Sequence, residues 1–353
     1  MTRKGPPAFQ LVTDRPGQWS AIRYRGLPRR PPAEGEVEIA VDAAGLNYYD
    51  VIKALDLTPS HSGNPALFGG ECAGTITSAG PGVTTFAPGD AVIACAFGAA
   101  ASHVVARADH VQRIPDGWTT AEAAGLVLAA ATAWHGLVQL GRLTAGETVL
   151  IHSAAGGVGL AAIQVARLVG ARVVATAGTE RKRAALRGLG ITHVFDSRSG
   201  QWSEQVRSAT RERGVDVVLN SLTGRAGEHN LDALGEDGRY IELSRFSINQ
   251  GGTLALGPFA KRLTFSAVDL SGFMRTRPDR FAALLAQVGQ LAAAGSLAPL
   301  PVARWPFAGA VAALREFAKG RHIGKFVLVR PETVRNVLPD PCPMSEPMVR
   351  SRA

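Results

Sequence analysis

Residues 148–160, which read TVLIHSAAGGVGL, decide the fold of this chain. The stretch begins with an apolar run, 148–152, that predicts a buried strand, and it ends by opening a helix predicted over 158–170. Small residues between strand and helix let backbone N–H groups approach a diphosphate, and the helix N-terminus adds positive potential. A glycine-rich run alone can be an ordinary turn, but the strand before it and the helix after it predict a dinucleotide-binding loop. The loop residues are Ala155, Gly156, Gly157, Val158 and Gly159.

Strands and helices continue to alternate after this loop. This alternation predicts an α/β Rossmann domain, in which a doubly wound parallel sheet is covered by helices on both faces. The predicted strands are 172–177, 193–195, 215–220, 239–243 and 263–269, and the predicted helices are 181–189 and 203–213.

The chain before the loop has a different character. Residues 36–40 alternate polar and apolar, and glycine-rich turns with short β-like runs continue to about residue 115, which predicts a mainly antiparallel β domain. Thr119 or Thr120 is expected to cap a helix that has Glu122 in its first turn. A helix predicted over 281–294 and a strand over 325–329 return the chain to the first domain.

These patterns divide the chain into two domains and a tail. We expect a substrate domain formed by residues 1–125 and 272–331, and a cofactor domain formed by residues 126–271. Residues 332–353 are polar, contain proline and lack any period, so we expect a flexible tail.

The cofactor is predicted from the residues after the second strand of the alternating half. NAD sites usually place an acidic side chain there, to bind the ribose hydroxyls. This chain instead has Thr179 followed closely by Arg181, Lys182 and Arg183, with Arg198 after the next strand. Cations suit a 2′-phosphate, so we expect NADPH, although a solvated helix start would also explain them. Thr179, Arg181, Lys182 and Arg198 are the expected contacts.

Composition limits the other possibilities. The chain is 46% hydrophobic and 19% charged, which is ordinary globular composition. The net charge of +9 would suit a nucleic-acid binder, but only 6% of residues are aromatic, so we expect an acidic partner or an anionic substrate instead. Three cysteines without a CxxC pair predict neither a disulfide framework nor a structural zinc site. No stretch is expected to span a membrane or act as a secretory signal, so the expected location is the cytoplasm.

Several segments together resemble the medium-chain dehydrogenase/reductase superfamily. They are GLNYYD at 45–50, GGECAG at 69–74, PGD at 88–90 and the dinucleotide loop. Zinc alcohol dehydrogenases of that superfamily carry a Cys in the first segment and a His in the second, where this chain has Asn47 or Tyr48 and Gly70. The resemblance therefore implies no metal, the quinone-oxidoreductase-like branch, and a GroES-like substrate domain joined to a Rossmann domain.

A narrower resemblance covers roughly residues 8–331. The chain is similar to the enoyl reductase domains of polyketide synthases through RIPDGW at 113–118, GVDVVLNSL at 214–222, GRYIE at 238–242, PLPV at 299–302 and HIGKFVL at 322–328. This resemblance implies NADPH-dependent reduction of the α,β double bond of an enoyl thioester on an acyl carrier protein during polyketide or lipid chain extension. The implied partners are that carrier protein and neighbouring synthase domains.

The resemblance also implies site residues. Related domains often place Tyr and Lys as proton donors where this chain has Thr58 and Arg245, whereas the matching Asp269 is kept. Arg is a poor proton donor, so we expect Arg245 and Asp269 to polarise and orient the substrate, with solvent as the proton source. The remaining candidates are Tyr48 for catalysis and, for cofactor binding, Asn47, Thr132, Asn220, Ser221, Leu222, Ser244 and Lys325.

Two alternatives stay open. The chain could be a free-standing quinone or enone reductase, or, given Thr58 and Arg245, a catalytically weak dinucleotide-binding domain. The predicted strand at 263–269 would form a sheet edge, and pairing of such edges across a two-fold axis predicts a homodimer.

Overall fold

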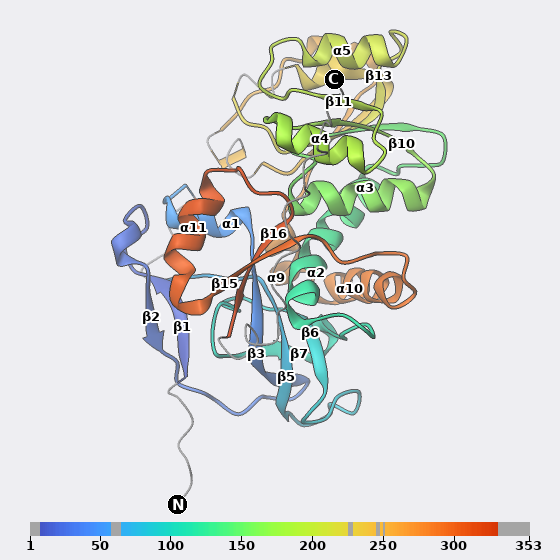
Figure 1. Cartoon of the computed structure of the whole chain (residues 1–353). Coiled ribbons are helices and arrows are strands. Elements are labelled where there is room, and N and C mark those ends of the chain that lie inside the picture. Colours follow the sequence, from blue (N-terminus) through green and yellow to red (C-terminus); the bar gives the residue numbers. More distant parts are fainter. Residues whose placement is uncertain (1–7, 58–64, 225–228, 245–247, 250, 331–353) are drawn as a thin grey trace, which may run out of the picture.

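The computed structural model describes residues 8–57, 65–224, 229–244, 248–249 and 251–330. Two large sheets lie at opposite ends of the molecule, joined by a central helix (Figure 1). This arrangement is the predicted one: a mainly antiparallel GroES-like domain and a Rossmann domain.

The first sheet has seven strands. Its order is β15-β16-β3-β5-β6-β8, with β7 on β3, and every pairing is antiparallel except the parallel one between β15 and β16. The strands are β3 (Glu36–Leu46), β5 (Glu71–Ala79), β6 (Ala91–Cys95), β7 (His103–Arg107), β8 (Val111–Arg113), β15 (Val302–Pro306) and β16 (Lys325–Val329). A small sheet lies beside it and contains β2 (Arg23–Gly26), β1 (Phe9–Thr13) and β4 (Ala66–Leu67). The short helix α1 (Tyr48–Ala54) lies between β3 and β4 in the chain.

The second sheet is entirely parallel, with the order β11-β10-β9-β12-β13-β14. This is the strand order of dinucleotide-binding sheets, in which the order of the strands reverses between the first strand, β9, and the fourth, β12. The strands are β9 (Thr148–Ile151), β10 (Arg172–Thr176), β11 (His193–Phe195), β12 (Val215–Asn220), β13 (Leu234–Glu242) and β14 (Thr264–Ala267). The helices that connect them are α3 (Gly157–Val169), α4 (Glu180–Gly188), α5 (Trp202–Ala209) and α7 (Asn230–Ala233).

Successive residues of β9 enter different cores, as expected for a strand covered on both faces. Val149 and Ile151 pack with residues of α2 (Thr120–Trp134) and α3, whereas Leu150 packs with Trp202 of α5. The helices on the two faces of the Rossmann sheet therefore each contribute a separate apolar layer.

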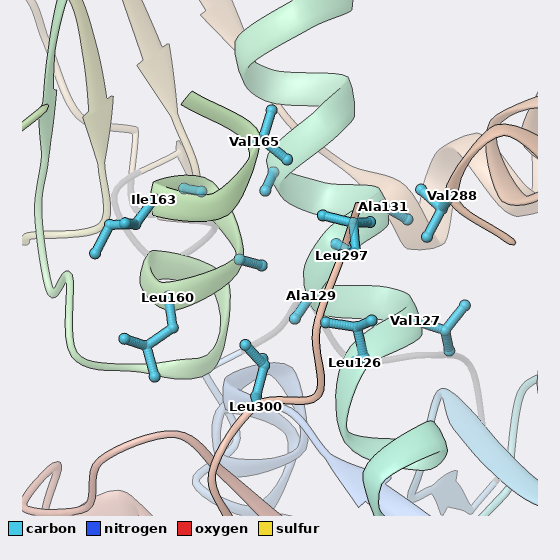
Figure 2. Close-up of a cluster of buried hydrophobic side chains, with 14 of the residues drawn as sticks. Leu126, Val127, Ala129, Ala131, Leu160, Ile163, Val165, Val288, Leu297 and Leu300 are labelled. Carbon is cyan, nitrogen blue, oxygen red and sulfur yellow. The ribbon is translucent and has the colours of Figure 1, made fainter. Parts of the chain in front are cut away.

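Helix α2 (Thr120–Trp134) connects the two sheets. Thr119 caps it, because its side chain accepts from the Glu122 backbone N–H and Glu122 in turn accepts from the Thr119 backbone N–H. Figure 2 shows α2 side chains packed with those of α3 and with Leu297 and Leu300, while Val288 of α10 (Pro278–Ala293) lies on the other side of α2. The stretch Thr120–Leu140 is long and apolar enough to span a membrane. However, 61% of its apolar 18-residue segment is buried inside the protein, which is typical of a core helix.

The end of the described chain returns to the first sheet. Helices α9 (Leu270–Thr276) and α10 (Pro278–Ala293) follow β14, and α11 (Ala310–Ala318) connects β15 to β16. Figure 1 shows these last strands and α11, in orange and red, among the blue strands of the N-terminal half. This return places residues 320–325 against the dinucleotide loop, where the Gly324 backbone N–H donates to the Ala155 carbonyl at 2.9 Å.

Candidate active site

A cavity of about 430 Å³ lies between the two domains and is lined by residues of both. It is bordered by the dinucleotide loop, by the segments that follow β12 and β13, by α1 and α2, and by the segment before β16. The carboxyl ends of parallel strands are where open α/β sheets bind ligands. Twelve of the predicted site residues line this cavity: Asn47, Tyr48, Thr132, Gly156, Gly157, Val158, Gly159, Lys182, Ser221, Ser244, Asp269 and Lys325.

The dinucleotide loop is packed too tightly for larger side chains. A Cβ on Gly159 would lie 2.5 Å from the Ala154 Cα, and a Cβ on Gly157 would lie 2.4 Å from the Lys325 Cδ. The glycines thus allow α3 to begin directly against the loop and against Lys325. The first N–H groups of a helix have no acceptor within it, so the start of α3 offers donors and positive potential to an anion in the cavity.

A second, smaller cavity of about 270 Å³ adjoins the first and shares Ser153, Lys182, Ser221, Thr223 and Gly320 with it. Thr179, Arg198 and Leu222 also line it, so three further predicted residues lie here. Thr179 additionally caps α4 by accepting from the Lys182 backbone N–H.

Two cations meet at this second cavity. The Arg198 side chain lies over Gly178, where an added Cβ would be 2.8 Å from Nε, and Lys182 Nζ donates to the Gly320 carbonyl at 2.7 Å. Burial lowers the pKa of Lys182, and the positive charges of Arg198 and Arg181 lower it further. A bound anion would reduce the repulsion between these like charges.

The other two basic residues of this cluster are placed differently. Arg183 is neutralised by Asp196, at 2.8 Å, and by Glu180, at 3.0 Å. Arg181, one of the predicted contacts, is exposed and does not line either cavity.

Two other predicted residues are buried and form hydrogen bonds that support the walls of the cavities. Ala155 is 1% exposed and supports the segment before β16 through its carbonyl. Asn220 is also 1% exposed; its Nδ2 donates to Glu242, and its Oδ1 accepts from the Leu222 backbone N–H. Burial raises the pKa of Glu242, which suits a carboxyl group inside this buried network.

A buried polar cluster lies on the floor of the larger cavity. Lys325 Nζ donates to Glu71 Oε1 at 2.7 Å and to Asn47 Oδ1 at 2.6 Å, and Asn47 Nδ2 donates to the same Glu71 oxygen at 2.9 Å. The Leu128 backbone N–H satisfies Glu71 Oε2 at 2.7 Å. Glu71 is fully buried and Lys325 is 3% exposed, so the cluster fixes Asn47 and Lys325 rigidly beside the dinucleotide loop.

The predicted catalytic residues are only partly described. Asp269 caps α9 by accepting from the Gly272 backbone N–H at 2.9 Å, and Tyr48 is 57% exposed at the cavity rim. Thr132 lines the cavity while its hydroxyl donates to the Leu128 carbonyl at 2.7 Å. Thr58 and Arg245 lie outside the described residues.

Sequence reasoning assigned no role to His322, which lines the larger cavity. Within the described ranges, His322 Nδ1 and Ser221 Oγ are the buried side-chain polar atoms that lack a hydrogen-bond partner. Buried polar groups are normally paired, so both atoms indicate a ligand. By contrast the buried His152 ring forms hydrogen bonds with Thr176 and Asn230 at 2.7 Å each, and burial lowers its pKa to about 4.

Comparison with known proteins identifies the family. Residues 33–116 match the alcohol dehydrogenase GroES-like domain, and residues 189–328 match a family described as zinc-binding dehydrogenase. Over 327 residues the chain is 40% identical to the mycocerosic acid synthase-like polyketide synthase of Mycolicibacterium smegmatis, a match that covers 92% of this chain and 15% of that protein. It superimposes on the CurK enoyl reductase with a TM-score of 0.85 and 33% identity, covering 92% of this chain and all of that one (100%). The chain belongs to the polyketide-synthase enoyl reductases.

The wider superfamily is also represented. The Escherichia coli quinone oxidoreductase, solved in complex with NADPH, is 25% identical, with a TM-score of 0.79 over 91% of this chain and 99% of that chain. This enoyl reductase is therefore an oxidoreductase of the medium-chain dehydrogenase/reductase type, a superfamily in which neighbours of this chain were solved with NADPH bound.

The donor set of this enoyl reductase does not fit the zinc ion named in one family description. Asn47 and Gly70 stand near the expected ligand positions, and Lys325 already places a positive charge between Asn47 and Glu71. Zinc sites use thiolates, imidazoles and carboxylates. Across residues 8–330 as far as they are described, His, Cys, Asp and Glu side chains form no group of three or more that could hold a metal.

Proposed function

We propose that this chain uses NADPH to reduce the α,β double bond of an enoyl thioester carried on an acyl carrier protein during polyketide or lipid chain extension. The observation that carries the proposal is the pair of adjoining cavities. One is bordered by a glycine-rich helix start and holds two unpaired buried polar atoms, and the other is lined by Arg198 and Lys182. These features suit a dinucleotide with an additional phosphate.

The residues suggest how the coenzyme is held. The start of α3 at Gly157 and the Ser221 hydroxyl suit the diphosphate, and Lys182 with Arg198 suits the 2′-phosphate. Asn47, Thr132 and Lys325, from the other side of the larger cavity, suit the ribose and nicotinamide. Because these groups come from both domains, coenzyme binding would hold the two domains together.

When bound, the reduced nicotinamide supplies the hydride for the β-carbon of the enoyl group. The chain's own residues must then stabilise negative charge on the thioester oxygen. Lys325 Nζ has two acceptors in the structure, and an ammonium carries three N–H groups, so one remains for a molecule in the cavity. That N–H suits the ribose or nicotinamide, so we assign polarisation and orientation of the thioester to Arg245 and Asp269, and protonation of the α-carbon to solvent.

The partners follow from the same relatives. The chain spans 15–16% of the length of the curated synthases that it matches, so an acyl carrier protein and neighbouring synthase domains are the proposed partners. We further propose a homodimer and a cytoplasmic location.

The test compares three substrates under identical conditions: a crotonyl-pantetheine thioester, a small quinone, and neither. We expect NADPH oxidation with the thioester to exceed the rate with the quinone by at least about tenfold, and no oxidation when neither acceptor is present. Faster reduction of the quinone would favour a free-standing quinone reductase. Coenzyme binding without oxidation of NADPH by either acceptor would favour a catalytically weak binding domain.

A further inference from the structure

His322 occupies an unusual position between the two domains. It belongs to the segment between α11 and β16, and its ring lies 4.4 Å from the Phe317 ring and 4.9 Å from the Phe326 ring, measured between centroids. These two phenyl rings fix the imidazole at the wall of the larger cavity. Its Nδ1 is buried without a hydrogen-bond partner, which is unfavourable unless a ligand supplies one.

The surroundings of His322 are built for an anion. Lys182 approaches from α4 and Lys325 from β16, and Glu316 on α11 opposes them weakly. Across the same cavity lie the start of α3, the second unpaired atom, Ser221 Oγ, and the Asp269 carboxyl group, which caps α9. Glu71 pairs with Lys325 at 2.7 Å, so the Lys182 ammonium and the start of α3 supply most of the positive potential near neutral His322.

The charge state of His322 without a ligand follows from these neighbours. Burial, together with the charges of Lys182 and Lys325, lowers its pKa to about 4, whereas Glu316 acts in the opposite direction. The imidazole is then neutral at physiological pH. A diphosphate in the cavity would reverse the local field, because its two negative charges would face both ammonium groups and the ring.

We propose that His322 is a coenzyme-binding residue that takes up a proton from solvent when the diphosphate of the dinucleotide enters the cavity. The imidazolium then donates from Nδ1 to a phosphate oxygen, which satisfies the atom left unpaired in the free protein. This inference rests on the proposed function, since it takes NADPH or NADP⁺ as the occupant.

A proton taken up on binding makes coenzyme affinity depend on pH. Above the pKa of the bound state, His322 stays neutral and contributes no charge. As the pH falls through that value, the complex gains a proton that the free protein does not, so affinity rises until the pKa of the free protein is reached. We therefore expect NADP⁺ to bind more tightly at pH 5.5 than at pH 7.5.

The test is calorimetric and needs no turnover. NADP⁺ is titrated into the whole chain between pH 5.5 and 7.5, in buffer pairs that differ in ionisation enthalpy, so that protons taken up per coenzyme are measured directly. The 2′-phosphate also titrates in this range, so wild type is compared with His322→Phe, which keeps the aromatic packing, and with His322→Gln. The matched control is His193→Gln, on the exposed face of β11.

We expect wild type and His193→Gln to take up the same number of protons, and both His322 variants to take up fewer and to bind NADP⁺ about 5- to 30-fold more weakly at pH 5.5. A difference that shrinks toward pH 7.5 supports proton linkage. Equal proton uptake in wild type and both His322 variants would overturn the inference while leaving the proposed function intact. No binding of NADP⁺ or NADPH at any pH would overturn both.

Discussion

At the residue scale, two basic side chains differ in whether their charge is available to bind a phosphate. Arg183 is paired with Asp196 and Glu180, whereas Arg198 lines the smaller cavity beside Lys182. Coenzyme preference should therefore depend on Arg198 and Lys182. Sequence reasoning found the basic cluster but could not separate its members, because the acid that neutralises Arg183 comes from a segment after the next strand.

Removing the Arg198 charge should change coenzyme preference more than catalysis. A charge-assisted hydrogen bond contributes about 1.5–3 kcal/mol when sheltered, and Arg198 is exposed, so we expect the lower end. Arg198→Ser should weaken NADPH binding by about 5- to 15-fold and leave NADH binding within twofold, as measured by fluorescence titration. Arg181→Ser is the matched control, with both affinities unchanged. Equal weakening of NADPH and NADH in Arg198→Ser would contradict the 2′-phosphate assignment.

The Lys325–Glu71 pair is a buried cation and anion from segments far apart in the chain. Removing one member of a buried pair leaves an uncompensated charge, which typically costs about 3–5 kcal/mol. Lys325→Met should lower the free energy of unfolding by that order, and the double variant Glu71→Gln/Lys325→Met should recover most of the loss in urea unfolding. Lys319→Met breaks an exposed pair with Glu316 and should cost less than about 1 kcal/mol. A double variant as unstable as Lys325→Met would contradict this account.

Long-range pairing of this kind explains what sequence reasoning missed at the site. The loop glycines and Ser221 were found because their signals are local: small residues, and the ends of predicted strands. His322 belongs to the HIGKFVL motif at 322–328 but received no role. Its unpaired Nδ1 depends on the fold, because α11 and β16 place the residue at the cavity wall.

At the element scale, prediction succeeded where the pattern was local and strong. The capping pair Thr119 and Glu122 marks the start of α2, and the β9–loop–α3 unit was found within one residue at most boundaries. Strand β13 starts earlier than predicted, at Leu234, because a bulge lets its first residue pair with Val215 before regular register resumes at Val217. Helix α11 and strand β15 were not predicted, since each is short and their burial depends on the first domain.

The close packing of α3 on its own loop gives a prediction at this scale. A Cβ at position 159 would lie within 2.6 Å of three Ala154 backbone atoms, which cannot move as a flexible side chain could. Gly159→Ala should therefore displace the start of α3, lower the melting temperature and weaken NADPH binding at least tenfold. Gly188→Ala is the control: an added Cβ there meets no atom within 4 Å, so stability should be unchanged or slightly higher. Normal coenzyme affinity in Gly159→Ala would be inconsistent with the loop geometry described here.

At the scale of the whole molecule, the six-stranded sheet ends in an edge strand. β14 pairs with β13 on one side, and Phe265 on β14 is 38% exposed. The unpaired backbone groups of such an edge strand can pair with the same strand of a second copy, and a lysine on the strand opposes this pairing. We expect light scattering to give twice the mass of one chain for the wild type and a single-chain mass for Thr264→Lys, with unchanged circular dichroism. A single-chain mass for the wild type would end the dimer proposal.

One chemical event in the cavity between the two sheets underlies the proposed function: transfer of hydride from NADPH to the β-carbon of an enoyl thioester. The most direct measurement uses NADPH deuterated at nicotinamide C4, as the 4R and 4S forms in separate reactions with crotonyl-pantetheine, and locates the label by mass spectrometry and NMR. We predict saturated product with one deuterium at the β-carbon from one of the two forms and none from the other. Recovery of unreduced thioester with both forms, or product without deuterium at the β-carbon, would contradict the central claim.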